Sequence, residues 1–195
     1  MHLNTNAVAA FFDQRAEHWD AHGKPQDAVV NAILDDAGIV PGVSVLDVGC
    51  GTGVLFPCYL SRGAAHVTGV DLSPGMIAQA YKKHRDPRVS LLCADASAAA
   101  LAPHDVCVVF NALPHFASPH ELIVSLSKAL VPGGRLTVAH CESRQVINAR
   151  HSAHASEVSH DLMPAEDLAE LFEPLFQVDT VHDGEDYYLV SGVLK

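Results

Sequence analysis

Short apolar runs rich in β-branched residues recur along the chain, at residues 43–48, 66–71, 89–93, 105–110 and 135–139. Stretches with the apolar spacing of helices lie between them, at 54–62, 74–84 and 119–130. Nearly continuous apolar strands that alternate with helices are typical of a parallel sheet covered on both faces. The pattern therefore predicts an α/β fold of three layers with a doubly wound, mostly parallel sheet.

The last part of the chain has a different pattern. Two strand-like segments, 175–181 and 187–195, flank the sequence HDGED, in which Asp183-Gly184 is a turn signal. These residues predict an antiparallel hairpin after the five parallel strands. Residues 1–40 contain two stretches with helical spacing, and residues 141–163 are polar and rich in histidine. We see no boundary to a second domain, so residues 1–195 are expected to form one.

Composition narrows the possible partners. The 195 residues are 49% hydrophobic and carry a formal net charge of −11, which gives no general attraction to nucleic acid or to anionic lipid. The one dense basic run, residues 82–85, is expected to be a solvated helix end. The five cysteines show no metal-type CxxC spacing. With no run of about 18 apolar residues and a polar beginning, the sequence predicts a cytoplasmic protein without nucleic-acid or membrane partners.

A glycine-rich turn follows the first strand in the sequence VLDVGCGTG, residues 45–53. It lacks the Lys-Ser/Thr pair of a phosphate-binding Walker loop. It also lacks the third glycine of the dinucleotide fingerprint, because Val54 stands at that position. Asp71 ends the next strand, where a carboxylate can accept hydrogen bonds from two ribose hydroxyls.

Four motifs in this order resemble those of the class I S-adenosylmethionine-dependent methyltransferases: VLDVGCGTG, VTGVDLSPGMIAQA, LLCADAS and LVPGGRL. The resemblance covers about residues 40–140 and implies a Rossmann-like, seven-stranded sheet with a reversed edge strand. It also implies S-adenosylmethionine as the cofactor and a small molecule as the methyl acceptor. The cofactor-binding residues that it suggests, together with the end of the fourth strand, are Asp47, Gly49, Gly51, Gly53, Asp71, Leu72, Met76, Asp95, Ala96 and Asn111.

The acceptor is expected beyond the carboxyl ends of the strands, where reacting groups collect in open α/β sheets. Asn111 and His115 follow the fourth strand, and His140 ends the fifth. The family's amino-methylating signature, Asn/Asp-Pro-Pro-Tyr/Phe, is absent, which argues against an adenine or glutamine side-chain acceptor. His115, His140 and His151 are the candidate catalytic residues. If these histidines act as general bases with ordinary pKa values, we expect activity to rise through pH 6–7 as they lose their protons.

The same histidines suggest a second use. His140, His151 and His160 are also candidate ligands for a divalent metal, since imidazoles suit such ions. Solvated histidines, or histidines that only shape the pocket, remain alternatives.

The division of the domain follows from these assignments. Residues 1–40 are expected to form a helical cover with Phe11, Phe12 and Trp19 as its apolar anchors, and residues 41–140 the cofactor-binding core. Residues 141–163 would be an insertion on the substrate side, and residues 164–195 a terminal helix and hairpin. Two other functions stay open: an NAD(P)-dependent oxidoreductase, and a non-catalytic module that binds S-adenosylmethionine.

Overall fold

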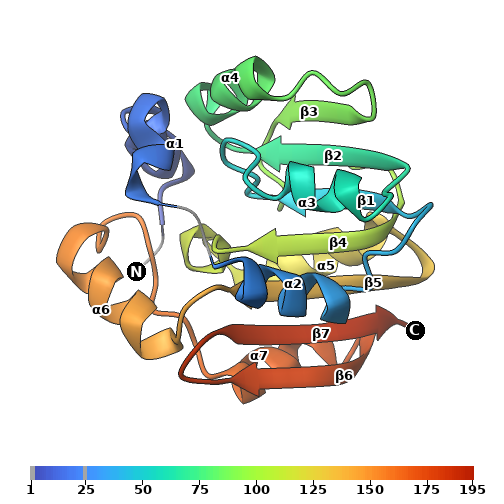
Figure 1. The fold of residues 1–195 in the computed structure, drawn as a ribbon. Coiled ribbons are helices and arrows are strands. Elements are labelled where there is room, and N and C mark those ends of the chain that lie inside the picture. The colour runs from blue at the N-terminus through green and yellow to red at the C-terminus, as the bar shows by residue number, and fades with distance from the viewer. Residues whose placement is uncertain (1–2, 24–25) are drawn as a thin grey trace.

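A computed structural model describes residues 3–23 and 26–195, and it contains one seven-stranded sheet (Figure 1). The strand order is β3-β2-β1-β4-β5-β7-β6, and β7 runs in the direction opposite to the other six strands. The strands are β1 (Ser44–Val48), β2 (His66–Asp71), β3 (Val89–Cys93), β4 (His104–Phe110), β5 (Leu130–His140), β6 (Phe176–Asp183) and β7 (Tyr188–Leu194).

Helices cover both faces of this sheet and create two apolar cores. One core lies under α2 (Asp27–Asp36), α3 (Phe56–Ser61) and α4 (Pro74–Lys83), and the other under α5 (Pro119–Lys128) and α7 (Ala165–Phe172). The central strand β1 supplies Leu46 and Val48 to one core and Val45 to the other, and all three are fully buried. Burial on both faces explains the continuous apolar runs of the sequence.

The three-layer architecture and the terminal hairpin confirm the fold that the sequence predicts. Two details differ. The reversed strand β7 lies inside the sheet, between β5 and the true edge strand β6. Strand β5 begins at Leu130, five residues before the expected start, because Leu130 already pairs with His104 on β4.

Two helical segments lie at the carboxyl ends of the parallel strands (Figure 1). The first comprises α1 (Thr5–Asp13) and the 3₁₀ helix η1 (Ala16–His22), which pack against α4. The second is α6 (Arg144–His154), which follows β5. Helix α2 packs in the core through Ile33 and Leu34, so the cover expected over residues 1–40 is confined to the segment before α2.

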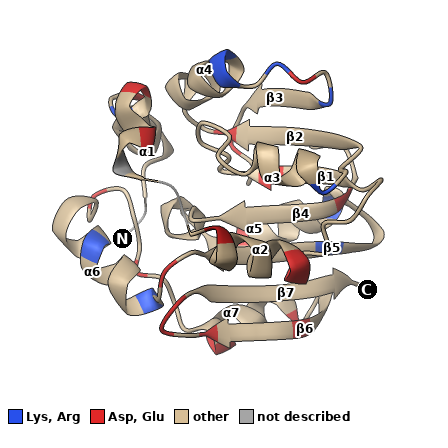
Figure 2. Cartoon of the chain, in the orientation of Figure 1, with Lys and Arg blue, Asp and Glu red and all other residues tan. Residues whose placement is uncertain are grey.

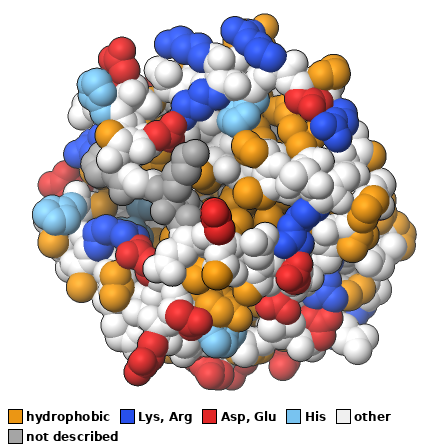
Figure 3. Space-filling model, viewed as in Figure 1, with side chains coloured by type: hydrophobic (Ala, Val, Ile, Leu, Met, Phe, Trp, Pro, Cys, Tyr) orange, Lys and Arg blue, Asp and Glu red, His pale blue; other side chains and the backbone are white. Residues whose placement is uncertain are grey.

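Charged side chains of both signs are spread over the molecule (Figures 2 and 3). The basic run at residues 82–85 is the end of α4, where Lys83 pairs with Asp20 and the Arg85 guanidinium lies over the Tyr81 ring. The expected helix end is therefore what forms there. Within the described residues, no helix is both long enough and apolar enough to span a bilayer.

Candidate active site

The glycine-rich turn after β1 is held by the carboxylate of Asp71 at the end of β2. Oδ2 of Asp71 accepts a hydrogen bond from the Gly51 amide at 2.8 Å, and Oδ1 accepts one from the Ser73 amide at 2.9 Å. Gly51 has φ = +54°, and a Cβ built there would meet nothing closer than the Trp19 Nε1 at 3.9 Å. The backbone is thus open to a ligand, while each Asp71 oxygen keeps a lone pair for a ribose hydroxyl.

Gly49 and Gly53 are required for packing. A Cβ at Gly49 would lie 2.6 Å from the Ala112 Cβ, and one at Gly53 would lie 2.6 Å from the ring of Phe56. Both residues have positive φ. Their role is therefore to let the turn pass between neighbouring segments, and Gly51 is the residue that faces open space.

Two acids, the buried Asp47 and the half-buried Asp71, lie together beneath this turn. Burial, and next the charge of Asp71, raise the pKa of Asp47 to about 8. Burial likewise raises the pKa of Asp71, against the lowering effect of its backbone donors. Two desolvated carboxylates favour a cationic ligand, and S-adenosylmethionine carries positive charge on its sulfonium and its amino group. The residues present therefore fit this cofactor.

The other predicted cofactor residues lie around the same edge of the sheet. Leu72 is half-buried beside Asp71, and Asp95 Oδ1 accepts a hydrogen bond from the Ser97 amide at 2.9 Å. Met76 and Ala96 are only 1% and 3% exposed, so their side chains serve packing in this structure. Their contact with adenine remains a prediction.

Asn111 ties the ends of two strands together. Its Oδ1 accepts a hydrogen bond from the Cys141 amide at 2.9 Å, and its Nδ2 lies 3.1 Å from the Cys141 Sγ. Asn111 has φ = +54°, a strained conformation for a residue other than glycine. Its side-chain amide therefore joins the carboxyl ends of β4 and β5.

Two carboxylates that the sequence analysis missed fasten the N-terminal segment over this edge. Asp13 Oδ1 accepts hydrogen bonds from the Ser73 hydroxyl at 2.5 Å and from the Gly75 amide at 2.8 Å, at the start of α4. Asp20 accepts one from the Thr52 hydroxyl at 2.7 Å and pairs with Lys83. No local sequence signal marks these contacts, because their partners lie about 30 to 60 residues away.

Aromatic rings lead from the glycine turn to the predicted catalytic histidines. Trp19, beside Gly51, packs edge-on against Phe12 at 5.4 Å between ring centroids, and Phe12 packs against His115 at 4.8 Å. His115 lies in the 3₁₀ helix η2 (Leu113–His115), and its ring is 5.0 Å from that of His151 on α6. Of the predicted anchors, Phe12 and Trp19 thus form a continuous line of ring contacts between the glycine turn and the histidines.

The three predicted catalytic histidines come together under α6, with His140 only 2% exposed. Burial lowers the pKa of His115 to about 4 and that of His140 to about 3, and the charges of their neighbours add to the effect. Burial also lowers the pKa of His151. The imidazoles of His115 and His140 are therefore neutral above about pH 5, and the activity rise expected through pH 6–7 does not follow from these two histidines.

One tautomer of His115 is selected by the backbone. Its Nδ1 lies 2.9 Å from the carbonyl oxygen of Val158, which only accepts hydrogen bonds, so Nδ1 carries the proton. The lone pair then resides on Nε2, which is the atom available as a base.

The structure does not bring the predicted metal ligands into a metal site. Among residues 3–23 and 26–195, no three His, Cys, Asp or Glu side chains form a group that could hold a metal ion. His140 and His151 are neighbours, but His160 lies in the segment after α6, where its amide donates to the Pro114 carbonyl oxygen at 2.8 Å.

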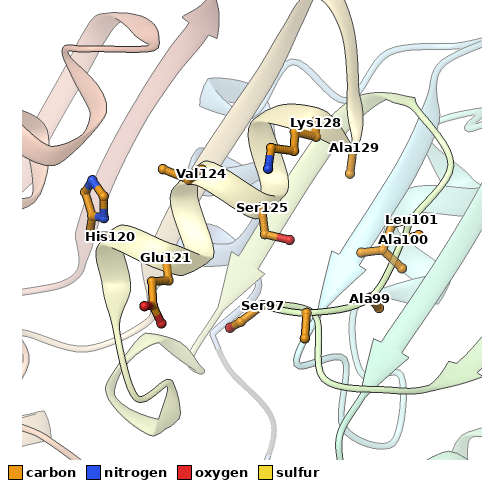
Figure 4. Close-up of a pocket in the computed structure, with 11 residues that line it drawn as sticks. Ser97, Ala99, Ala100, Leu101, His120, Glu121, Val124, Ser125, Lys128 and Ala129 are labelled. Atoms are coloured by element: carbon orange, nitrogen blue, oxygen red, sulfur yellow. The ribbon is translucent and has the colours of Figure 1, made fainter.

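A hollow of about 560 Å³ lies elsewhere, between α5 and the loop after β3 (Figure 4). Its walls are mostly small side chains, with His120, Glu121 and Lys128 at the rim. None of the predicted site residues lines it, so the site is assigned by the convergence of Asp71, the glycine turn and the histidines.

Comparison with known proteins agrees with this geometry. Residues 45–134 match the family described as methyltransferase domain. A malonyl-[acyl-carrier protein] O-methyltransferase of Priestia megaterium is 31% identical over 69% of this chain and 51% of its own length. A ubiquinone biosynthesis O-methyltransferase of Xylella fastidiosa is 38% identical over 62% of this chain and 53% of its own length. The chain thus spans about half the length of these curated relatives.

Solved structures show the same fold. The magnesium protoporphyrin IX methyltransferase of Synechocystis, solved with bound S-adenosylhomocysteine, superposes with a TM-score of 0.73 over 98% of this chain and 99% of its own, at 16% identity. An S-adenosylmethionine-dependent methyltransferase of Mesorhizobium loti gives 0.71 over 84% and 96%, at 20% identity.

The chain belongs to the class I S-adenosylmethionine-dependent methyltransferases. The match covers the glycine turn, Asp71, and the strands that carry both.

Asp71→Ala tests the assignment of the cofactor site. We expect a loss of about 2–4 kcal/mol in affinity for S-adenosylhomocysteine, because the variant loses charge-assisted hydrogen bonds to ribose and the acceptor that orders the Gly51 amide. Isothermal titration calorimetry measures it. Asp86→Ala is the control, since Asp86 pairs only with Arg88 in the loop after α4. Equal affinity in wild type and Asp71→Ala would show that the ribose lies elsewhere.

The raised pKa of Asp47, about 8, predicts a pH-dependent cofactor affinity. At pH 7 the ligand-free protein holds Asp47 protonated, and a cationic ligand favours its carboxylate form. Binding therefore releases a proton, and affinity for S-adenosylmethionine rises with pH until it levels off above about pH 8. Calorimetric titrations at pH 6, 7, 8 and 9 measure this slope, which Asp47→Asn should flatten. An affinity that falls with pH in the wild type would contradict the assignment.

Proposed function

We propose that the protein transfers a methyl group from S-adenosylmethionine to an acidic oxygen of a small molecule, such as a phenol. The observation that carries the proposal is the convergence of three imidazoles beyond the ends of β4 and β5, those of the buried His140 and the half-buried His115 and His151. The ring of His115 also contacts Phe12 of the N-terminal cover. The names of both curated relatives describe O-methyltransferases, which supports oxygen as the acceptor atom.

When bound, S-adenosylmethionine supplies an electrophilic methyl carbon on a sulfonium. The protein's contribution is to place the acceptor in line with that carbon and to receive the acceptor's proton. His115 is suited to receive it, because Val158 holds the proton on Nδ1 and leaves Nε2 free. A base with a pKa of about 4 has a low proton affinity, which is why an acidic hydroxyl fits better than an aliphatic alcohol.

The N-terminal segment would exclude water from this reaction. Asp13 and Asp20 hold α1 and η1 on α4 and on the glycine turn, while Phe12 packs on His115. The cover therefore contacts the cofactor side and the acceptor side at once. Release of Asp13 and Asp20 from their partners would open both sides together.

The two alternative functions have less support. The nicotinamide-dependent oxidoreductase gains nothing from the family match at residues 45–134. A non-catalytic module would not need three imidazoles gathered in a partly desolvated site, whose desolvation is a cost to folding. A catalytic use of the histidines explains that cost.

Conversion of S-adenosylmethionine to S-adenosylhomocysteine, followed by chromatography with a panel of phenols and aliphatic alcohols, tests the proposal. We expect turnover with phenols, and a decrease in kcat of about 10²–10³-fold in His115→Gln with S-adenosylmethionine affinity unchanged. His154→Gln is the matched control, because His154 is exposed on the same helix as His151. Because His115 has a pKa of about 4, its protonation should not reduce the kcat of the wild type between pH 8 and pH 6.

Two outcomes would contradict the proposal. Methyl label that appears in none of the phenols would exclude the acceptor class. An unchanged kcat in His115→Gln would show that His115 receives no proton and only shapes the pocket.

A further inference from the structure

Three adjacent strands end in a row of polar side chains beyond the histidines. Tyr188 on β7 is the register partner of His140 on β5 and of Asp183 on β6. Side chains of paired residues lie on the same face of a sheet, and the rings of His140 and Tyr188 are 5.9 Å apart between centroids. The row therefore runs from the histidine cluster across the sheet to the hairpin.

This row holds buried polar atoms without a hydrogen-bond partner among the residues that the structure describes. Three of them lie in the row: the Nε2 of His140, the hydroxyl of Tyr188 and the Oδ1 of Asp183. A fourth, the Nδ1 of His151, lies on α6. Tyr188 is 0% exposed and His140 is 2% exposed. Each unpaired buried polar group costs about 1–3 kcal/mol, and such groups are rare in folded proteins. Their concentration in one row points to a ligand that pairs them.

Helix α6 lies along the same row. At its start, Arg144 Nε donates to Asp183 Oδ2 at 2.7 Å, and two turns later His151 packs against His115. The helix thus spans from the far end of the row to the proposed base (Figure 1). A molecule bound beneath α6 could therefore contact both Asp183 and the proposed base, His115.

Resting on the proposed function, we propose that Tyr188 and Asp183 form the far end of the acceptor site and bind an uncharged hydroxyl group of the acceptor, remote from the oxygen that is methylated. The free Oδ1 of Asp183 accepts a hydrogen bond, and the Tyr188 hydroxyl can donate one. Together they suit a hydroxyl group, which can donate a hydrogen bond to Asp183 and accept one from Tyr188.

The local charges oppose an anion most strongly, because Glu166 and Asp167 act on Tyr188 in addition to the paired Asp183 and Arg144. A cation would meet the Arg144 guanidinium and the proton of the Tyr188 hydroxyl. Burial raises the pKa of the Tyr188 hydroxyl well above its ordinary value, which keeps that donor protonated. The acceptor is therefore a phenol, or a similar acid, that carries a second, neutral hydroxyl at its other end.

Two phenols of nearly equal shape test this subsite: 4-hydroxybenzyl alcohol, with a distal hydroxyl, and 4-ethylphenol, with a methyl group there. Calorimetry with the full chain saturated with S-adenosylhomocysteine measures their binding without any turnover. We expect wild type to prefer 4-hydroxybenzyl alcohol by about five- to tenfold, the contribution of one hydrogen bond. Tyr188→Phe should abolish that preference, while Tyr187→Phe should retain it.

The stability of the ligand-free protein gives a second readout. Because the Tyr188 hydroxyl has no partner among the described residues, Tyr188→Phe should leave the unfolding temperature unchanged or raise it. A fall of several degrees would show that the hydroxyl is structural and would overturn the proposal. Equal binding of the two phenols, binding of neither, or a preference that survives in Tyr188→Phe would overturn it as well. A turnover assay that fails while the preference is present would instead count against the proposed function alone.

Discussion

The carboxylate of Asp71 is the contact on which the arrangement of the site depends. It joins the end of β2 to the glycine turn after β1, through the Gly51 amide, and to the start of α4, through the Ser73 amide. The same end of α4 is where Asp13 fastens the N-terminal cover. One buried acid thus fixes the turn, the helix and, through the helix, the position of the cover. Since each of its oxygens accepts one of these two hydrogen bonds, each also keeps a lone pair for a ligand.

Burial gives the two halves of the site opposite electrostatic character. On the cofactor side, Asp47 and Asp71 are acids whose pKa values are raised by desolvation, so a cationic ligand relieves their cost. On the proposed acceptor side, desolvation lowers the pKa values of His115 and His140, so these groups stay neutral near pH 7. The acids therefore suit the positively charged cofactor. The neutral imidazoles suit an acceptor that must lose a proton. The rings of Trp19 and Phe12 lie between the glycine turn and His115.

Most of the fold could be predicted from the sequence, because strands buried on both faces leave continuous apolar runs and helices leave periodic ones. Asp71 and the glycine turn were also predictable, because each directly follows or ends a strand that the apolar pattern identifies. The fastening by Asp13 and Asp20 was not, because those contacts join segments about 30 to 60 residues apart. The sequence does not show that His151 packs against His115 while His154, on the same helix, is exposed, because packing decides it. The pH dependence expected from ordinary imidazoles does not follow for His115 and His140, because burial, which the sequence does not give, lowers their pKa values. The position of His160 likewise depends on the path of the segment after α6.

A crystal structure with bound S-adenosylhomocysteine tests the central claim most directly. The account predicts that both ribose hydroxyls donate to the carboxylate of Asp71 and that the sulfur faces the ring of His115, with the cover of α1 and η1 in place. A ribose bound away from Asp71, or a sulfur that points away from the three imidazoles, would contradict it.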